Sequence, residues 1–406
     1  MGKNKREFLV VFCIMIAFGF GWLIGFGNEV FFNTKGVMNQ IAPVSNINPI
    51  GIDLRQMLSY SRSLSHLKTP YINANIYPPL LSIIGVPLLL MPIQVTYVLI
   101  SFLTIFSLFG GLIIVSKNIG QQVRAPLIFL FFCITTFFSY GFHFELERGQ
   151  LNLITLFFAV LGIMFFRQNK KILALVFLSL AIQLKLNPLI FLIFFFNFKF
   201  KDFKNLLFLG VSALFNAGLL FILGGKVFIE FTQRISQQFS HPFLWIGNHS
   251  LLSYCTPGDV PVTFCSLQMY PYLLAAYAIM LGTAILLTWR KKLPLFNSYL
   301  FALSGCGTLL VPSVSHDYTL SVLAIFLLPF CKDMYGFFLA NKNNLLLFFL
   351  SLVVFLYTLT VFSYTTAWTV IPISVNKAPI LILLCFSIFI SMFFIPNTEK
   401  IKKLFV

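Results

Sequence analysis

Residues 95–116 read VTYVLISFLTIFSLFGGLIIVS and contain no charged side chain. A helix rises about 1.5 Å per residue, so a run of this length crosses the roughly 30 Å hydrocarbon core of a bilayer. Similar runs recur along the 406 residues, of which 59% are hydrophobic and 10% are charged. Soluble domains carry about 25% charged residues, and disordered chains have low hydrophobicity. The composition therefore excludes a soluble enzyme and a disordered chain, and it predicts an all-α polytopic membrane protein.

The apolar runs predict a bundle of about twelve transmembrane helices. A further run, Pro79–Met91, is too short to cross, so we expect a half-inserted helix that Pro92 ends. The first long run has the length of a signal peptide but lacks a clean cleavage site, and we interpret it as a retained span. We expect crossings near Phe8–Gly27, Val95–Ser116, Ala125–Tyr140, Leu151–Phe166, Ile172–Leu184, Leu189–Phe198, Leu206–Leu223, Met269–Trp289, Phe296–Val311, Tyr318–Phe330, Leu345–Phe362 and Pro379–Ile395.

The net charge of +17 comes from small basic clusters between apolar runs. Such clusters are typical of cytoplasmic loop flanks, so we expect no nucleic-acid partner. With both termini in the cytoplasm, 19 of the 28 Lys and Arg lie on inner flanks and 9 lie outside. Residues 1–406 then form a single integral membrane domain with two long extracytoplasmic loops, residues 28–78 and 225–268. Short spans interrupted by Pro, as around Asn187-Pro188, indicate a protein-walled cavity near the outer face.

Asp53 is the acid of most interest in the first of these loops. It opens an amphipathic stretch in which six residues are spaced as one helix face, namely Leu54, Met57, Leu58, Ser61, Leu64 and Leu67. The plain alternative is an N-cap aspartate on an interfacial helix. The sequence has no His or carboxylate pairs at metal-ligand spacing and no nucleotide-binding loop. We therefore expect no metal and no cofactor.

Three basic residues next to apolar runs are candidates for binding an anion. Lys185 ends an apolar stretch, and an ionisable group at such depth is functional by default unless it snorkels to the surface. Arg148 precedes another span, where it can instead pair with Glu145 or Glu147. His316 follows Pro312 at the outer end of a short span, where it can simply cap the turn. Two cysteines in the second loop, Cys255 and Cys265, are candidates for a disulfide because they share an oxidising compartment.

Six short motifs, taken in order, resemble glycosyltransferase family 87, a bacterial branch of the multi-span C superfamily. Each motif is weak alone, but the ordered set covers most of the chain from Asp53 to Tyr318. The motifs are Asp53 itself, Asn75-Ile76-Tyr77-Pro78-Pro79-Leu80, Arg148-Gly149-Gln150-Leu151-Asn152, Leu184-Lys185-Leu186-Asn187-Pro188, Gly247-Asn248-His249-Ser250-Leu251 and Ser315-His316-Asp317-Tyr318.

The resemblance implies an inverting enzyme of the bacterial inner membrane with an outer-face cavity open to lipid. The donor is a sugar on a polyprenyl phosphate, with mannose as the family default, and the acceptor is a lipid-linked or envelope glycan. Asp53 maps onto the family's catalytic base. A base accepts the acceptor's proton, and cations stabilise the leaving phosphate, so we assign Lys185, Arg148 and His316 to the phosphate. The other motif residues expected to line the cavity are Tyr77, Gln150, Asn152, Asn248, Ser250 and Asp317.

Other classes of protein also fit a dozen spans with buried charges. A secondary transporter or lipid flippase is the main alternative, although the sequence has no repeat symmetry and carries acids in long outer loops. A non-enzymatic scaffold in envelope assembly is a third possibility, but it has no use for Lys185 in an apolar run.

Overall fold

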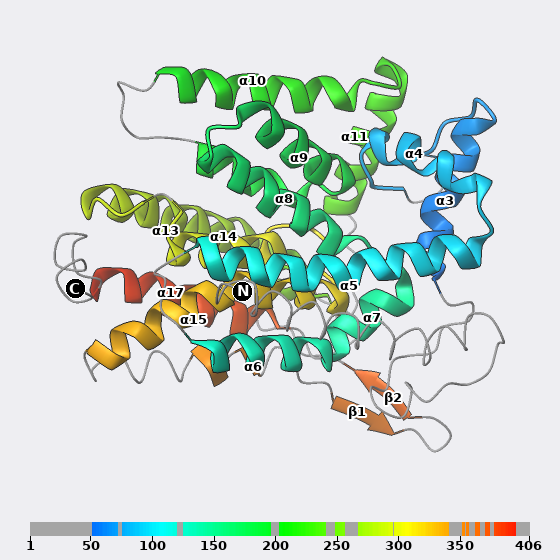
Figure 1. The fold of residues 1–406 in the computed structure, drawn as a ribbon. Helices are drawn as coiled ribbons and strands as arrows, with labels where there is room; N and C mark the ends of the chain where they lie inside the picture. Colours follow the sequence, from blue (N-terminus) through cyan, green and yellow to red (C-terminus); the bar gives the residue numbers. More distant parts are fainter. Residues whose placement is uncertain are drawn as a thin grey trace, which may run out of the picture.

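The structure is a computed structural model, and it describes residues 51–71, 75–119, 125–195, 203–240, 248–255, 267–294, 296–340, 351–353, 355–356, 362–365, 370–373 and 377–394. These residues form a helical bundle with one short antiparallel hairpin at its edge, in which Phe362 pairs with Ile373 (Figure 1). The predicted all-α class is therefore confirmed for the bundle. The hairpin consists of β1 (Phe362–Thr365) and β2 (Val370–Ile373).

The helices follow the apolar runs of the sequence closely. The α-helices are α3 (Ile52–Ser65), α4 (Pro79–Gly85), α5 (Ile93–Asn118), α6 (Pro126–Phe137), α7 (Tyr140–Arg148), α8 (Asn152–Arg167), α9 (Lys171–Leu184), α10 (Phe203–Leu220), α11 (Gly225–Ser240), α12 (Leu251–Tyr254), α13 (Tyr270–Arg290), α14 (Ser298–Leu310), α15 (Leu323–Ala340) and α17 (Ala378–Phe394). The 3₁₀ segments are η1 (Pro87–Leu90), η2 (Asn187–Phe195), η3 (Leu267–Met269) and η4 (Asp317–Val322).

Fewer helices than predicted are long enough to cross a bilayer. Within the described residues, α5, α13 and Asp317–Gly336 meet that length, and two bent pairs, α6 with α7 and α10 with α11, bring the total to five at most. The expected count of about twelve is thus too high for this part of the chain. The reason is that several predicted crossings form apolar helices of only 10–17 residues, α8, α9, α14 and α17 among them.

The remaining apolar runs of the sequence differ in their outcomes. The described part of the predicted span Leu189–Phe198 lies in the 3₁₀ segment η2, which ends at Phe195, and not in an α-helix. The short run Pro79–Met91 folds as α4 followed by η1 and stops before Pro92, as expected for a helix that does not cross. The predicted span Phe8–Gly27 and most of Leu345–Phe362 lie outside the described residues.

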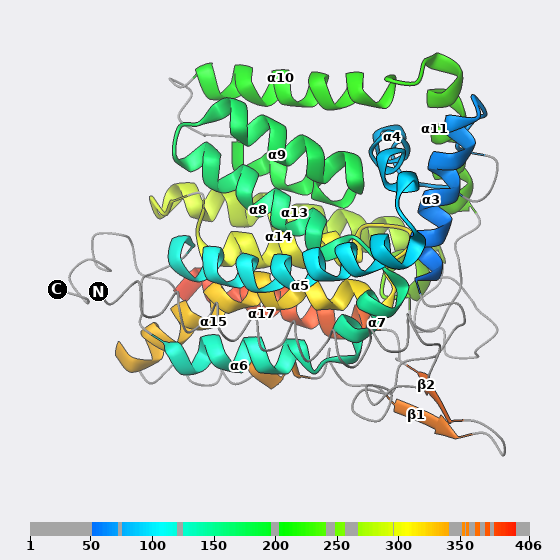
Figure 2. The ribbon, with the colours of Figure 1, turned by 45° about the vertical axis from the view of Figure 1, so that its right-hand side comes forward.

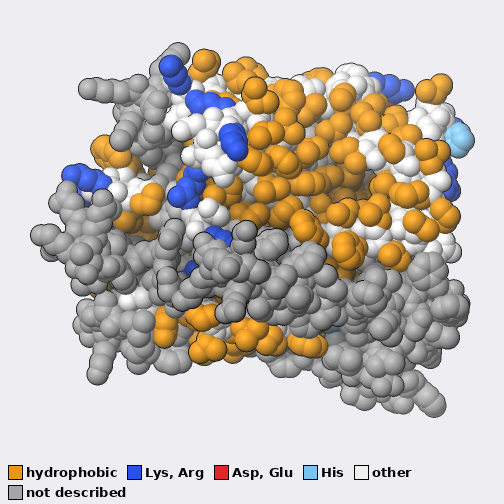
Figure 3. All heavy atoms as spheres, viewed as in Figure 1, with side chains coloured by type: hydrophobic (Ala, Val, Ile, Leu, Met, Phe, Trp, Pro, Cys, Tyr) orange, Lys and Arg blue, Asp and Glu red, His pale blue; other side chains and the backbone are white. Residues whose placement is uncertain are grey.

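Apolar side chains fill both the centre and the outer surface of the bundle. Every residue of α14 is buried, while α10 exposes Leu206, Leu207 and Leu214. Hydrophobic side chains cover much of the face in Figure 3, and Lys and Arg gather mainly at one end of it. An exposed apolar surface of this extent suits a helix bundle surrounded by lipid.

The path of the chain brings several motifs to one end of the bundle. Helix α8 starts at Asn152, directly after α7, and α9 returns antiparallel to it and ends at Leu184. Asn152 and Lys185 therefore lie at the same end, opposite the basic turn between α8 and α9. Both ribbon views place α3, α4 and α11 together at this end, beside α7 (Figures 1 and 2).

Two glycines with left-handed backbone fix α3 against the end of α7. Gly51 (φ 74°) donates its N–H to the Glu147 carbonyl at 2.7 Å. Gly149 (φ 66°) ends α7, and a Cβ at this position would lie 2.8 Å from the Leu54 Cβ. Only glycine combines that backbone conformation with so close an approach. The predicted amphipathic stretch forms α3 as far as Ser65, whereas Leu67 lies beyond the end of the helix and is exposed. The N-cap of α3 is Gly51, so the N-cap interpretation of Asp53 is wrong.

Candidate functional site

Asp53 and Lys185 are joined through a single glutamine at the α3 end of the bundle. The Gln150 side chain donates from Nε2 to Asp53 Oδ2 at 2.6 Å and accepts at Oε1 from Lys185 Nζ at 2.9 Å. Asp53 comes from the first turn of α3, Gln150 from the connection between α7 and α8, and Lys185 from the connection that follows α9. Asp53, Gln150 and Lys185 thus form one polar cluster, which we call the Asp53 cluster. Asp53 and Gln150 are 97 positions apart in the sequence.

Arg148 lies on the other side of the Asp53 carboxylate. Its Nη1 is 3.7 Å from Asp53 Oδ1, and its Nε is 3.2 Å from Glu147 Oε2. The guanidinium also lies over the Phe144 ring, 4.8 Å from the ring centroid. The alternative interpretation of Arg148, an ion pair with a neighbouring glutamate, is confirmed for Glu147. The same side chain nevertheless reaches Asp53, so the two interpretations are compatible.

The Lys185 ammonium is held in a pocket of polar and aromatic groups. It donates to Asn152 Oδ1 at 2.6 Å, and it lies 5.7 and 5.6 Å from the ring centroids of Tyr77 and Tyr318. Burial in this loop between α9 and η2 lowers the pKa of Lys185 from about 10.5 to about 8, against the opposing effect of the Glu145 and Asp53 carboxylates. Lys185 does not snorkel away from the protein, because its ammonium faces the rest of the Asp53 cluster.

Glu145 is a buried acid close to this cluster that sequence reasoning assigned only as a partner for Arg148. Its side chain is completely buried, accepts the Leu153 N–H at 2.8 Å and is bonded by the Ser321 hydroxyl. These bonds connect α7 to the start of α8 and to η4. Many solvated acids also stand near the end of an apolar run. The sequence alone therefore does not indicate that Glu145 is buried and connects these segments.

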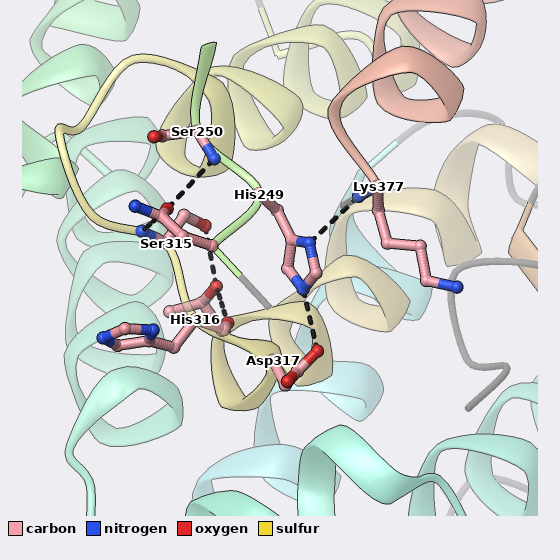
Figure 4. Close-up of polar contacts among 8 residues, drawn as sticks. His249, Ser250, Ser315, His316, Asp317 and Lys377 are labelled. Atoms are coloured by element: carbon pink, nitrogen blue, oxygen red, sulfur yellow. Dashed lines mark hydrogen bonds and ion pairs between the residues drawn. The ribbon is translucent and has the colours of Figure 1, made fainter. Parts of the chain in front are cut away.

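The two motifs around His249 and His316 are locked together by backbone and side-chain bonds (Figure 4). Asn248 forms an antiparallel bridge with His316, and His249 N–H donates to the Ser315 carbonyl at 2.6 Å. Asn248 also accepts the Ser315 N–H at 2.8 Å through Oδ1, and Ser250 donates to the Ser313 carbonyl at 3.0 Å. Asn248 and Ser250 were expected to line a cavity, but both are completely buried and hold this junction together.

His249 and Asp317 form a buried pair behind His316. His249 Nε2 lies 2.9 Å from Asp317 Oδ1, while Nδ1 accepts the Lys377 backbone N–H at 3.0 Å. Since a backbone N–H only donates, Nδ1 must be the unprotonated nitrogen of a neutral imidazole, and Nε2 carries the proton toward the carboxylate. Figure 4 shows the imidazole between Asp317 and Lys377. Sequence reasoning missed this pair, because 68 residues separate its members.

His316 lies near the Asp53 cluster, next to Tyr318. Its ring centroid lies 5.3 Å from that of Tyr318, whose ring also faces Lys185. Burial lowers the pKa of His316 to about 4, although the neighbouring Asp317 carboxylate opposes the shift. His316 is therefore neutral at pH 7 and offers a hydrogen bond to an anion, not a positive charge.

A small cavity opens beside Lys185 and extends between α8, η2, α14 and η4. Its polar lining includes Asn152, Thr155, Lys185 and Thr319, and its apolar lining includes Phe326. Among the described residues no group of three His, Cys, Asp or Glu side chains is arranged to hold a metal ion. Cys255 is buried, and Cys265 lies outside the described part of the chain, so their disulfide stays a prediction.

The fold and the polar cluster define a membrane-embedded helical protein with an acid and several anion-binding groups at one end. The family model of glycosyltransferase family 87 matches residues 75–315. Because this match covers more than half of the chain, the protein belongs to glycosyltransferase family 87. Among curated proteins, no match was found. Membership of the family makes the protein a glycosyltransferase, and therefore an enzyme that uses a sugar donor and an acceptor, which decides against the transporter and scaffold alternatives.

Proposed function

We propose that the protein is an inverting glycosyltransferase that moves a hexose from a polyprenyl-phosphate donor to a lipid-linked or envelope glycan acceptor. The observation that carries the proposal is the Gln150 side chain, which bonds Asp53 on one side and Lys185 on the other. A carboxylate and an ammonium held next to each other supply the two groups such a transfer needs. These are a base for the acceptor hydroxyl and a cation for the leaving phosphate.

Asp53 is the proposed base. Its side chain is 21% exposed, so an acceptor hydroxyl can reach it, and Gln150 fixes its orientation. A carboxylate oxygen held in this way can take up the proton of the acceptor hydroxyl. The family match begins at residue 75, after Asp53. This assignment therefore rests on the position of Asp53 in the cluster and on its resemblance to the first-loop acid of the family.

Lys185 is the proposed partner of the donor phosphate, with Arg148 and His316 around it. Lysine binds phosphate as a point charge, and arginine can bind it with two parallel hydrogen bonds. His316 contributes a hydrogen bond from a neutral ring. Asp53 and Glu147 hold Arg148 close to the cluster, where an arriving phosphate can compete for its guanidinium. Mannose, the family default, is the sugar we propose.

The site is proposed to face the extracytoplasmic side of the bacterial inner membrane, with both termini in the cytoplasm. The basic turn between α8 and α9 lies at the opposite end of the bundle from Asp53 and Lys185. Basic residues favour the cytoplasmic side of short loops, so this separation supports an outer site. A polyprenyl-linked donor then enters laterally from the lipid, and the acceptor arrives from outside.

Donor consumption by the purified protein tests this function. Protein in detergent is mixed with a prenyl-phosphate mannose and a lipid extract of bacterial envelopes, and the release of prenyl phosphate is followed. We expect release that depends on the protein and a product whose anomeric configuration, read by nuclear magnetic resonance, is opposite to that of the donor. Retention of configuration, or no release with mannosyl and glucosyl donors alike, contradicts the proposal.

A further inference from the structure

The cavity beside Lys185 has no part in the chemistry proposed above. Its volume is about 30 Å³, which is room for about two water-sized groups. Lys185, which belongs to the Asp53 cluster, and its hydrogen-bond partner Asn152 also line this cavity and so connect it with that cluster. Phe191 and Phe326 are among its apolar lining residues. A ligand bound at the cluster can therefore extend one small substituent into it.

Two buried polar atoms of cavity-lining residues lack a hydrogen-bond partner among the described residues. They are Asn152 Nδ2 and Thr155 Oγ1, whose residues are 6% and 3% exposed. Both stand on α8 three positions apart, which places them on one face of the helix. The Asn152 amide cannot simply turn over, because its Oδ1 accepts from Lys185. By contrast, the hydroxyls of Thr308 and Thr319 already donate to backbone carbonyls.

Unpartnered buried polar groups are rare in folded proteins, and each one calls for an explanation. An amide N–H and a hydroxyl on the same face of α8 match a ligand hydroxyl, which both donates and accepts. The apolar part of the lining suits a methylene group. A cavity of this size is too small for a whole sugar ring, but a methylene carrying one hydroxyl fills it.

We infer that this cavity is the subsite for the exocyclic hydroxymethyl group of the donor sugar, with Asn152 and Thr155 as its hydrogen-bond partners. The inference rests on the proposed function, since it assumes that the donor phosphate binds at Lys185. It makes Thr155 a specificity-determining residue that selects hexosyl over pentosyl donors. Neither Asp53 nor Gln150 lines the cavity, so neither takes part in this selection.

Binding of three matched probes tests the subsite without knowledge of the acceptor. The probes are a short-chain prenyl phosphate, its mannosyl ester and its lyxosyl ester, because lyxose is mannose without the hydroxymethyl group. For the full-length protein we expect the mannosyl probe to bind about tenfold more tightly than the lyxosyl probe, the scale of one or two hydrogen bonds. Thr155→Val should reduce this preference to about twofold by weakening the mannosyl probe alone, whereas Thr155→Ser should keep it.

Thr136→Val is the matched control. Thr136 is completely buried on α6, its hydroxyl also lacks a partner among the described residues, and it does not line the cavity. We expect it to leave the preference unchanged. Equal affinity of the wild-type protein for both sugars, or equal weakening of both by Thr155→Val, would overturn the subsite. If plain prenyl phosphate does not bind, or if Lys185→Gln does not weaken its binding, the proposed donor site fails instead.

Discussion

Replacing Asp53 with asparagine keeps the shape of the side chain but removes its charge and its ability to take up a proton. One carboxylate oxygen accepts from Gln150 at 2.6 Å, and the other lies 3.7 Å from Arg148. An amide oxygen can still accept from Gln150, although the bond loses its ionic character, which costs about 1 kcal/mol. The partly exposed ion pair contributes about 0.5 kcal/mol more. We expect the free energy of unfolding to fall by about 1–2 kcal/mol, so the variant folds.

The expected effect on catalysis is much larger than the effect on stability. A general base contributes about 10²–10⁴-fold to the rate, which corresponds to about 3–5 kcal/mol of activation free energy. The assay is the initial rate of prenyl phosphate release, measured on a preparation whose donor affinity and thermal unfolding are recorded in parallel. We expect Asp53→Asn to bind the donor about as well as the wild-type protein while its rate falls at least about 100-fold.

Glu230→Gln provides the control for a general effect of removing an acid from the predicted outer loops. Glu230 stands on α11, where it is bonded by the Thr69 hydroxyl and lies outside the Asp53 cluster. This variant should keep a rate close to that of the wild-type protein. The reasoning about Asp53 is refuted if Asp53→Asn transfers sugar at a rate within about tenfold of wild type, or if its only defect is a loss of donor binding.

Four further predictions follow from the same contacts. Donor affinity should fall as the pH rises through about 8, because the ammonium of Lys185 loses its proton around its lowered pKa; Lys185→Arg should remove this dependence, and a titration at pH 6.5–9.5 checks both. Gly149→Ala should lower the free energy of unfolding by at least about 1–2 kcal/mol, since alanine is strained at φ 66° and its Cβ would press on Leu54; unchanged thermal unfolding would argue against the close packing. His249→Ala should destabilise the protein by about 3 kcal/mol, because the buried Asp317 carboxylate loses the N–H that His249 donates to it; an unfolding titration measures this effect, and Asp317→Asn in the same background should partly relieve it. A cysteine at Ser240 should react with an impermeant thiol reagent added to the outside of cells, and labelling only after lysis would reverse the proposed topology.

Much of the fold could be predicted because lipid leaves the backbone few alternatives. Without water, each N–H and C=O must be bonded within the segment, so an apolar run folds as a helix. The run predicted as Val95–Ser116 accordingly forms α5 over Ile93–Asn118. Helix length was the weaker inference. Basic clusters and prolines mark where runs end, but they do not say whether a run of 14 residues, such as α9, crosses a membrane or packs inside a bundle.

Some features of the candidate site could also be predicted from neighbouring residues in the sequence, whereas others arise only when distant segments meet in the fold. Gly149 and Gln150 stand next to each other in one motif, so sequence reasoning could group them. The pairing of His249 with Asp317 has no such local signal, because it depends on how the segment before α12 meets the segment before α15. Asp53 was a candidate N-cap of the predicted helix, and the position of Gly51 explains why this interpretation is wrong. The turn that starts α3 needs a left-handed residue, and Gly51 supplies it, which leaves the aspartate free to face Gln150.

Gln150 connects the proposed base, Asp53, with the proposed phosphate-binding cation, Lys185. The orientation of its amide follows from the hydrogen-bonding properties of these two groups. A carboxylate accepts hydrogen bonds and an ammonium donates them, so the amide must turn its N–H toward Asp53 and its oxygen toward Lys185, as it does. Each contact is strongest when Asp53 is deprotonated and Lys185 is protonated, because hydrogen bonds to charged groups are the stronger ones. A carboxylate and an ammonium are also the groups that the proposed transfer needs, as a base for the acceptor hydroxyl and as a cation for the leaving phosphate. In this structure, one neutral side chain orients both Asp53 and Lys185 and stands between them in place of a direct ion pair.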